Sequence, residues 1–130
     1  MRTPGRDKHT DTDDIEDRAF EFAAAIVRLV REHENEMPRP MSEALVRSGA
    51  TIGSHILQAN NGQSRRNFLS QMTSARKLSL EVSYWLKLLL VCGITTKTDV
   101  RPFLEVAHDL RVDLTTICAK ARTQLETDKS

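Results

Sequence analysis

The sequence of 130 residues lacks the features of several large protein classes. Two cysteines, Cys92 and Cys118, are too few for the disulfide framework of a small secreted domain, and we expect both to be buried thiols. The longest apolar run, residues 85–94, is about half the length needed to cross a bilayer and contains Lys87. Residues 1–11 are polar and hold no signal-peptide core. We therefore expect a cytoplasmic protein without a membrane partner.

Aromatic residues are also scarce, at 5% of the chain. This scarcity favours a core of aliphatic side chains contributed by packed helices. No segment combines strict alternation of apolar and polar residues with the β-branched enrichment of a strand, so we expect no sheet. A glycine-rich phosphate loop and a serine-nucleophile motif are both missing, which leaves catalysis without support from the sequence.

What the chain does contain is four segments with apolar residues at helical spacing. The first is stopped by Pro38 and Pro40, the second runs from about Ser42 to Ala59, the third covers about residues 65–92, and the fourth starts near Thr98 or Asp99. We predict an all-α protein, an up-down-up-down four-helix bundle over residues 12–125. Flexible tails are expected at residues 1–11 and 126–130.

The connections between these segments carry residues suited to helix ends. Asn60-Asn61-Gly62 separates the second segment from the third, and Ser64 can cap the N-terminus of the third helix. Gly93 can cap its C-terminus. The second and third segments are therefore expected to form an antiparallel hairpin.

Two glycines, Gly49 and Gly53, lie inside the second helix on or beside its apolar stripe. A glycine in a helix interior costs about 1 kcal/mol relative to alanine, so it needs a compensating gain. We expect that gain to be close approach of a neighbouring helix, with the tight contact inside the hairpin. A bulkier side chain at either position should separate the helices.

The later part of the third helix is apolar on nearly all sides. Leu78 and Trp85 flank its core stripe on one side and Leu80 on the other, while Tyr84 and Leu88 point nearly opposite to it. A bundle helix normally buries only one stripe. We therefore predict that these five residues form an oligomer interface, with the two aromatic residues as anchors. The alternative is that the N-terminal segment or the fourth helix covers them within one chain.

The charge is unevenly distributed, although the net charge is only +1. Residues 1–36 carry six Lys/Arg and ten Asp/Glu, whereas residues 37–94 carry seven Lys/Arg and two Asp/Glu. The candidate nucleic-acid contacts are the basic residues of the hairpin, namely Arg47, Arg65, Arg66, Arg76 and Lys77. No aromatic residue interleaves them, so base stacking is not indicated. The alternative is a solvated face, or pairing with the acidic first helix through Asp13, Asp14, Asp17 or Glu21.

For an enzyme, the best candidate pair is Glu105 and His108, which have the spacing found in di-iron bundles. The apolar seam of the fourth helix directs Glu105 away from the core, and the other helices supply no inward carboxylates to complete a site. We therefore expect no metal, no cofactor and no catalysis. His55 is expected to be a partly buried histidine with a hydrogen-bond partner, whereas His9 and His33 are expected to be solvated.

Several pieces of the chain, taken in order, resemble the four-helix-bundle proteins encoded in intervening sequences of 23S ribosomal RNA genes. These pieces are Phe22-Ala23 with Ile26 and Leu29, then Arg47-Ser48 with Ile52 and Ile56, then Ser64, Phe68, Ala75, Glu81 and Tyr84-Trp85-Leu86. The chain departs from the family pattern at His55 and Gln58, where asparagine and glutamate are common. Both remain able to form hydrogen bonds, which suits a structural bridge better than proton transfer.

The resemblance implies a homopentamer around a central channel. It also implies kinship with accessory proteins of diversity-generating retroelements, which bind a reverse transcriptase and nucleic acid. We therefore predict a non-enzymatic, self-assembling scaffold or adaptor that forms a ring-like homo-oligomer, with nucleic acid or a nucleic-acid enzyme as the first candidate partner. One alternative is a protein-only adaptor whose charges organise the oligomer, and a more remote one is a metal-binding bundle enzyme.

Overall fold

The computed structural model describes residues 12–129, and over that range it contains four α-helices and no strand. The helices are α1 (Thr12–Glu32), α2 (Arg39–Asn60), α3 (Arg65–Val91) and α4 (Lys97–Lys129). The prediction of an all-α protein with four helices is confirmed. The expected N-terminal tail, residues 1–11, lies outside the described residues.

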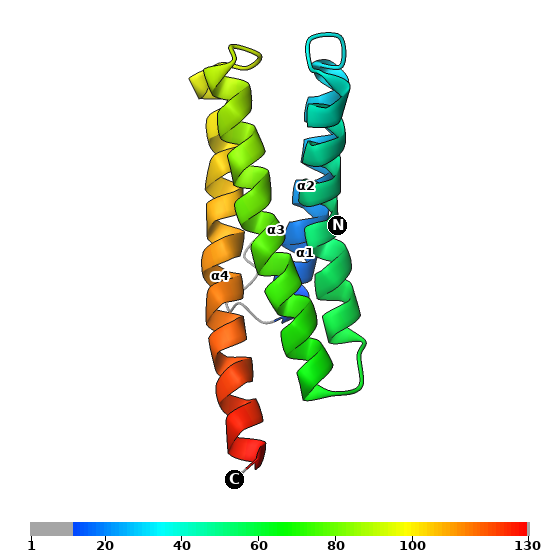
Figure 1. Cartoon of the computed structure of the whole chain (residues 1–130), viewed down its shortest axis with the longest axis vertical. Helices are drawn as coiled ribbons and strands as arrows, with labels where there is room; N and C mark the ends of the chain where they lie inside the picture. Colours follow the sequence, from blue (N-terminus) through cyan, green and yellow to red (C-terminus); the bar gives the residue numbers. More distant parts are fainter. Residues whose placement is uncertain (1–11, 130) are drawn as a thin grey trace.

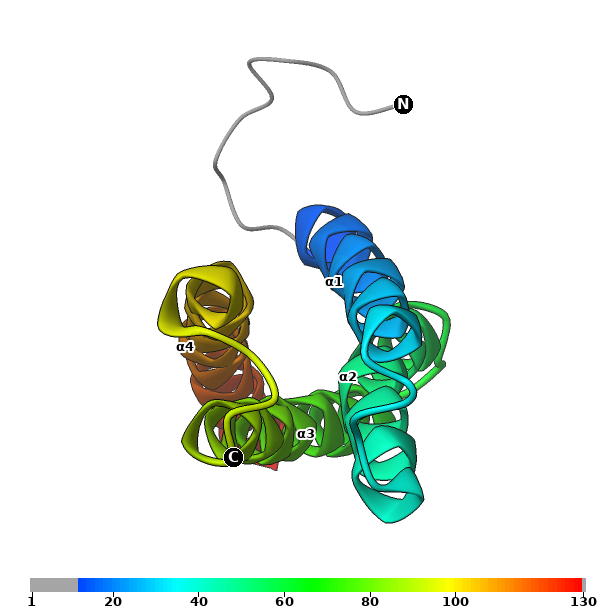
Figure 2. The same cartoon turned by 90° about the horizontal axis from the view of Figure 1, so that it is seen from above.

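The helices follow one another around the bundle. The loops that join α1 to α2 and α3 to α4 lie at one end of the molecule, and the loop that joins α2 to α3 lies at the other (Figure 1). Each helix packs on the next along the chain, whereas α1 and α4 make the smallest contact of the neighbouring pairs. Seen from above, the four helices form an open arc with α1 and α4 at its ends (Figure 2). The bundle is therefore held together least firmly between α1 and α4.

Two helix boundaries differ from the expected ones. Helix α2 begins at Arg39 rather than at Ser42, because Pro38 is its N-cap and Pro40 lies in its first turn, where a missing N–H group needs no partner. Helix α4 continues to Lys129. Residues 126–129, which we expected to belong to a C-terminal tail, are therefore helical.

The caps expected at the ends of α3 are both present. At the N-terminus, Oγ of Ser64 accepts a hydrogen bond of 3.0 Å from the backbone amide of Asn67. At the C-terminus, Gly93 has a φ of +75°. Its amide donates to the carbonyl of Leu90, and the amide of Ile94 donates to the carbonyl of Leu89 at 3.0 Å. This pair of bonds is the Schellman arrangement, and it uses the left-handed conformation that glycine adopts without strain.

Replacing Gly93 with alanine should destabilise the bundle by about 1 kcal/mol, because an L-residue in the left-handed conformation crowds its own Cβ. A Cβ at this position would have no other atom within 4 Å, so the whole cost is conformational. Urea unfolding followed by circular dichroism measures it. The matched control is Cys92→Ala, since Cys92 is exposed and has a φ of −83°. Equal midpoints for the two variants would contradict the need for glycine at this cap.

The core is aliphatic, as the scarcity of aromatic residues predicted. Phe22, which is 3% exposed, is the aromatic residue among the buried side chains of the described residues. The largest fully buried side chains come from all four helices, namely Ile15, Ile26, Leu45, Ile52, Ile56, Met72, Val82, Leu86, Leu89, Val100, Leu110 and Leu114. Two serines, Ser48 and Ser79, are buried among them, and each donates its hydroxyl to a carbonyl of its own helix, at 2.7 and 2.6 Å. The hydroxyl groups of both buried serines are therefore paired.

The glycines of α2 contact a different helix from the one we expected. A Cβ built on Gly49 would lie 2.9 Å from Cγ1 of Ile26, and one built on Gly53 would lie 3.5 Å from Cβ of Ala19. Both neighbours belong to α1, so the close approach is between α1 and α2 and not inside the α2–α3 hairpin. The reason is the helical period, which turns these two positions away from His55, the residue that faces α3.

Candidate interaction surfaces

The five residues predicted to form an oligomer interface divide into two groups. Leu80 and Tyr84 point outward from α3, with 46% and 60% of their surface exposed. Leu78, Trp85 and Leu88 are half-buried and pack against the core of their own chain. The three half-buried residues are thus partly covered within one chain, whereas the surface of Leu80 and Tyr84 remains available to another molecule.

The exposed row on α3 is longer than the sequence analysis indicated. Val91, near the end of the helix, has 81% of its surface exposed. Relative to Leu80 it is rotated by about 20° around the helix, and Tyr84 by about 40°, at 100° per residue. The α3 outer face, defined here as Leu80, Tyr84 and Val91, is thus one side of the helix, on which the exposed Lys87 lies between Tyr84 and Val91. Cys92 beside it is exposed, which corrects our expectation that both cysteines are buried; Cys118 is buried as expected.

Trp85 is positioned by a polar group rather than left free as an anchor. Its indole Nε1 donates to Oε2 of Glu81 at 3.4 Å, and the same oxygen lies 3.6 Å from Nη2 of Arg47 on α2. The ring meets Tyr84 edge-on, with centroids 5.1 Å apart and planes at 83°. Trp85 therefore helps to join α3 to α2, and Tyr84 carries the aromatic surface that faces outward.

The basic residues of α3 point toward α4 or into solvent. Arg65 forms an ion pair of 3.1 Å with Asp128, and Nε of Arg76 donates to Oγ1 of Thr115 at 2.9 Å. Arg66 and Lys77 are exposed. Helices α1 and α3 do not pack against each other. Arg65 and Arg76 therefore contact α4, and not the acidic helix α1 as one alternative had it.

A polar cluster between α2 and α3 surrounds His55. Its Nδ1 lies 2.6 Å from Oε1 of Gln71, and because an amide oxygen only accepts, the imidazole donates. Gln71 in turn donates to Gln58 at 3.5 Å, and Gln58 donates to Oγ of Ser54 at 3.2 Å. His55 and Gln58 thus act as the structural bridge that their departure from the family pattern suggested.

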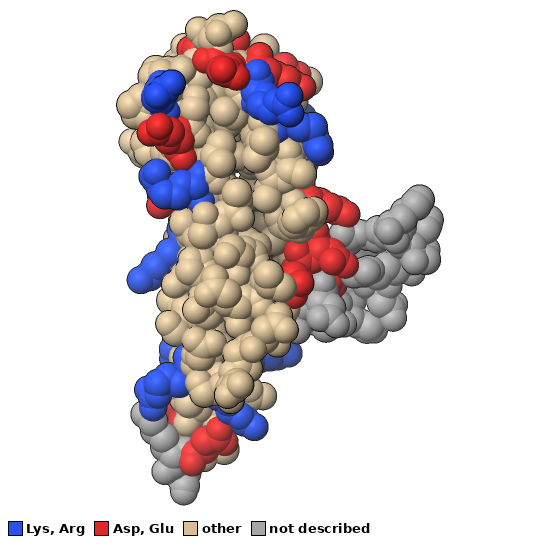
Figure 3. Space-filling view, turned by 90° about the vertical axis from the view of Figure 1, so that its right-hand side faces the viewer, with Lys and Arg blue, Asp and Glu red and all other residues tan. Residues whose placement is uncertain are grey.

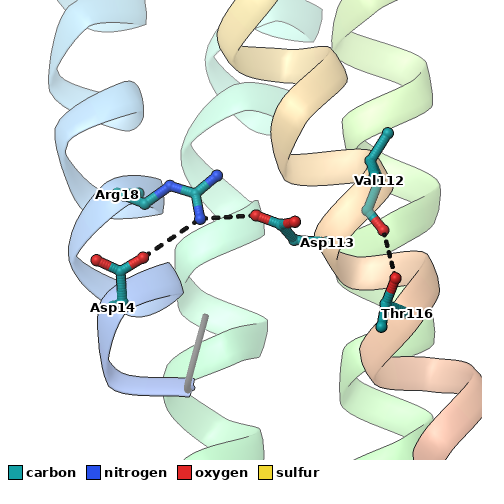
Figure 4. Close-up of polar contacts among 5 residues, drawn as sticks. All are labelled: Asp14, Arg18, Val112, Asp113 and Thr116. Atoms are coloured by element: carbon teal, nitrogen blue, oxygen red, sulfur yellow. Dashed lines mark hydrogen bonds and ion pairs between the residues drawn. The ribbon is translucent and has the colours of Figure 1, made fainter. Parts of the chain in front are cut away.

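The guanidinium group of Arg18 links α1 to α4, the two helices at the ends of the arc. Nη1 of Arg18 on α1 lies 2.7 Å from a carboxylate oxygen of Asp113 on α4 and 3.4 Å from one of Asp14 (Figure 4). All three side chains are partly shielded from solvent. The link joins helices that otherwise pack weakly, and the sequence analysis missed it because its partners are 95 residues apart.

The face formed by α2 and the adjoining part of α1 is uncharged in its middle. In Figure 3 the charged side chains gather toward the two ends and edges of this face. Exposed apolar side chains of these helices include Leu57, with 49% of its surface exposed, and Phe20, with 74%.

Glu105 and His108, the pair with di-iron spacing, are both exposed on the surface of α4. Nδ1 of His108 is 3.1 Å from a guanidinium nitrogen of Arg111. Within residues 12–129, no three His, Cys, Asp or Glu side chains gather where they could hold a metal ion. Over the same residues, no helix combines the length and the apolar character that a membrane span requires.

Comparison with known proteins points to one family. The model of the 23S rRNA-intervening sequence protein family matches residues 12–116. Among solved structures, the chain is similar to a protein of unknown function from the S23 ribosomal protein family of Bacteroides thetaiotaomicron, with 29% identity and a TM-score of 0.77. That match covers 83% of this chain and 97% of the other. A search of curated proteins gives no match.

Proposed function

The chain belongs to the 23S rRNA-intervening sequence protein family, and we propose that it is a non-enzymatic adaptor that works as a ring-like homo-oligomer. Each subunit is an up-down-up-down bundle, and the subunit count that the family resemblance implies is five. The ring presents the basic side chains of its subunits to another macromolecule, in the first place nucleic acid.

The observation that carries self-assembly is the α3 outer face. Its three apolar side chains have between 46% and 81% of their surface exposed. Exposed apolar side chains on one side of a helix, with an aromatic residue among them, are typical of an interface, because burying them removes apolar surface from water. A single large aromatic side chain buries roughly 150–250 Å² when it is fully covered. Tyr84 is the expected anchor.

Support for a nucleic-acid partner comes from the N-terminal half of α3. Arg65, Arg66, Arg76 and Lys77 lie within the thirteen residues 65–77 of α3, and that segment contains no acidic residue. A ring would repeat this cluster once per subunit, so that many weak phosphate contacts act together. Because the ion pair of Arg65 with Asp128 is mostly exposed, it costs little to exchange for a phosphate.

A gel-shift titration with a single-stranded RNA oligonucleotide tests the partner. Binding should weaken steeply with salt, and Arg66→Glu combined with Lys77→Glu should lower the affinity by at least about tenfold, because phosphate contacts become repulsions. The matched control is Arg101→Glu, which reverses an exposed charge on α4 outside the cluster.

The same titration also distinguishes the second candidate function. If the protein shifts no RNA even at low ionic strength, the nucleic-acid partner is excluded. The protein-only adaptor would then be favoured, since Arg47 and Arg65 already pair with Glu81 and Asp128 inside the chain.

A further inference from the structure

A pocket lies at the end of the bundle that carries the α2–α3 loop, where α4 also has its C-terminal end (Figure 1). Its volume is about 420 Å³, within the range of roughly 300–1,000 Å³ that small-ligand sites occupy. Three helices and the loop supply the lining, namely Ala59, Asn60, Gly62, Gln63, Ser64, Arg65, Phe68 and Gln124. The pocket therefore combines an aromatic ring with amide groups and one positive charge.

Phe68 supplies the aromatic surface of the pocket. It is half-buried, so that part of its side chain packs on the core and part lines the pocket. No aromatic side chain was assigned to the basic cluster from the sequence. Phe68 corrects that interpretation, because it follows Arg65 by one helical turn and lines the same pocket. An aromatic face can stack with any nucleobase, since every base has a π-face.

Two amide side chains at the pocket are available to a ligand. Gln63 in the loop and Gln124 on α4 are exposed, and neither side chain has a hydrogen-bond partner among residues 12–129. Asn60 differs from them, because its amide donates to Oε1 of Glu16 at 2.8 Å. A primary amide offers two donors and an acceptor oxygen, a combination that pairs with the edge of a nucleobase.

Arg65 is the charged residue of the lining, and 61% of its side chain is exposed. Its ion pair with Asp128, at 3.1 Å, is open to water on both sides, so a phosphate can replace the carboxylate at little cost. Arg65 and Phe68 are three positions apart on α3, which is about 4.5 Å along the helix axis. A single nucleotide can span that spacing, with its phosphate at Arg65 and its base at Phe68.

We propose that this pocket binds one unpaired nucleotide of a nucleic-acid strand. The base stacks on Phe68, the amides of Gln63 and Gln124 pair with its edge, and the guanidinium of Arg65 binds its phosphate. The pocket deepens the nucleic-acid binding proposed above and rests on it. The other basic residues of α3 hold the strand by its phosphates, and the pocket selects strands with a free base. A base inside a duplex cannot enter unless it first leaves its stack and its partner.

Gel-shift titrations with a single-stranded RNA oligonucleotide and with an RNA duplex of the same length test this selection. Phosphate contacts alone favour the duplex, because its charge density is higher and it releases more counterions. The pocket predicts the opposite order, with the single strand bound at least about tenfold more tightly at physiological ionic strength. Equal affinities, or a preference for the duplex, overturn the pocket and leave the nucleic-acid partner standing. No shift with either probe overturns both.

Phe68→Leu tests the stacking surface, because leucine keeps an apolar contact with the core and removes the aromatic face. It should lower the affinity for the single strand about tenfold and leave the affinity for the duplex unchanged. The matched control is Phe20→Leu, which removes a phenylalanine that is 74% exposed on α1, outside the pocket, and should change neither affinity. Circular dichroism checks that each variant is folded.

Gln124→Ala gives an independent variant if Phe68→Leu disturbs the core. Gln124 is exposed on α4, so its replacement leaves the core intact. The affinity for the single strand should fall about threefold, again without an effect on the duplex. A single-strand affinity that is the same in the parent protein and in Gln124→Ala, with no loss in a folded Phe68→Leu protein, overturns the pocket.

Two further measurements use the unmodified protein. Photo-crosslinking with a single-stranded RNA that carries 4-thiouridine should link the RNA to the peptide that contains Phe68, and crosslinks confined to α1 or α2 would overturn the pocket. Adenosine monophosphate distinguishes a strand from a free nucleotide as the source of the base. It should compete with the strand only at a concentration at least about a hundredfold higher, because it lacks the phosphates that contact the rest of α3. Binding of the mononucleotide as tight as that of the strand would overturn the strand as the ligand.

Discussion

Replacing Gly49 with leucine is expected to destabilise the bundle by about 3 kcal/mol, the upper end of the cost of overpacking a core. The first carbon of the new side chain would already lie 2.9 Å from Cγ1 and 3.1 Å from Cγ2 of Ile26, which is fully buried. The remaining carbons could fit only if α1 moved away from α2. Urea unfolding at a fixed protein concentration measures the change, because the stability of an oligomer depends on concentration.

The matched control for this prediction is Gly53→Ala. A Cβ there would meet Ala19 at 3.5 Å, an ordinary contact, and alanine favours a helix over glycine by about 1 kcal/mol. The control should therefore be as stable as the parent protein or slightly more stable. A Gly49→Leu protein with an unchanged midpoint would show that α1 does not pack closely on α2.

Replacing Leu80 and Tyr84 together with aspartate should dissociate the oligomer while each subunit stays folded. Both side chains are largely exposed in the single chain, so little packing inside the subunit is lost. In the assembly, two carboxylates would be buried without partners in an apolar contact, which costs several kcal/mol for each copy. Size-exclusion chromatography with light scattering gives the mass, and circular dichroism gives the helical content.

Val112→Asp serves as the control for the double change. Val112 is on α4, 43% exposed, and does not belong to the α3 outer face. This variant should keep the mass of the parent oligomer. Retention of the parent mass by the Leu80→Asp, Tyr84→Asp variant would exclude the α3 outer face as the interface. Trp85 is not a suitable target, because it packs on the core and bonds Glu81.

The sequence predicts the helices well because their signals are local. Ser64 and Gly93 act through bonds to residues within five positions, so their roles follow from residue type and spacing. The start of α2 was misplaced because Pro40 is compatible with a first turn as well as with a break. The partner of Gly49 was assigned to the wrong helix, since the period of one helix gives its buried side but not the identity of the neighbour.

The candidate surfaces were only partly predictable for the same reason. The excess of apolar residues near Tyr84 and Trp85 is visible in the sequence. The sequence does not show that Trp85 is held by Glu81, which in turn lies beside Arg47 of the neighbouring helix, while Tyr84 stays exposed. The ion pair between Arg18 and Asp113 has no sequence signature, because its two residues are 95 positions apart along the chain.

Sedimentation equilibrium of the unmodified protein over a wide range of concentrations tests the central claim most directly. One chain has a mass of 14.7 kDa. The proposed ring predicts a single species of five chains that persists on dilution into the low micromolar range. A species of 14.7 kDa at every concentration would contradict the account, because the exposed apolar stripe on α3 would then have no second copy to cover it.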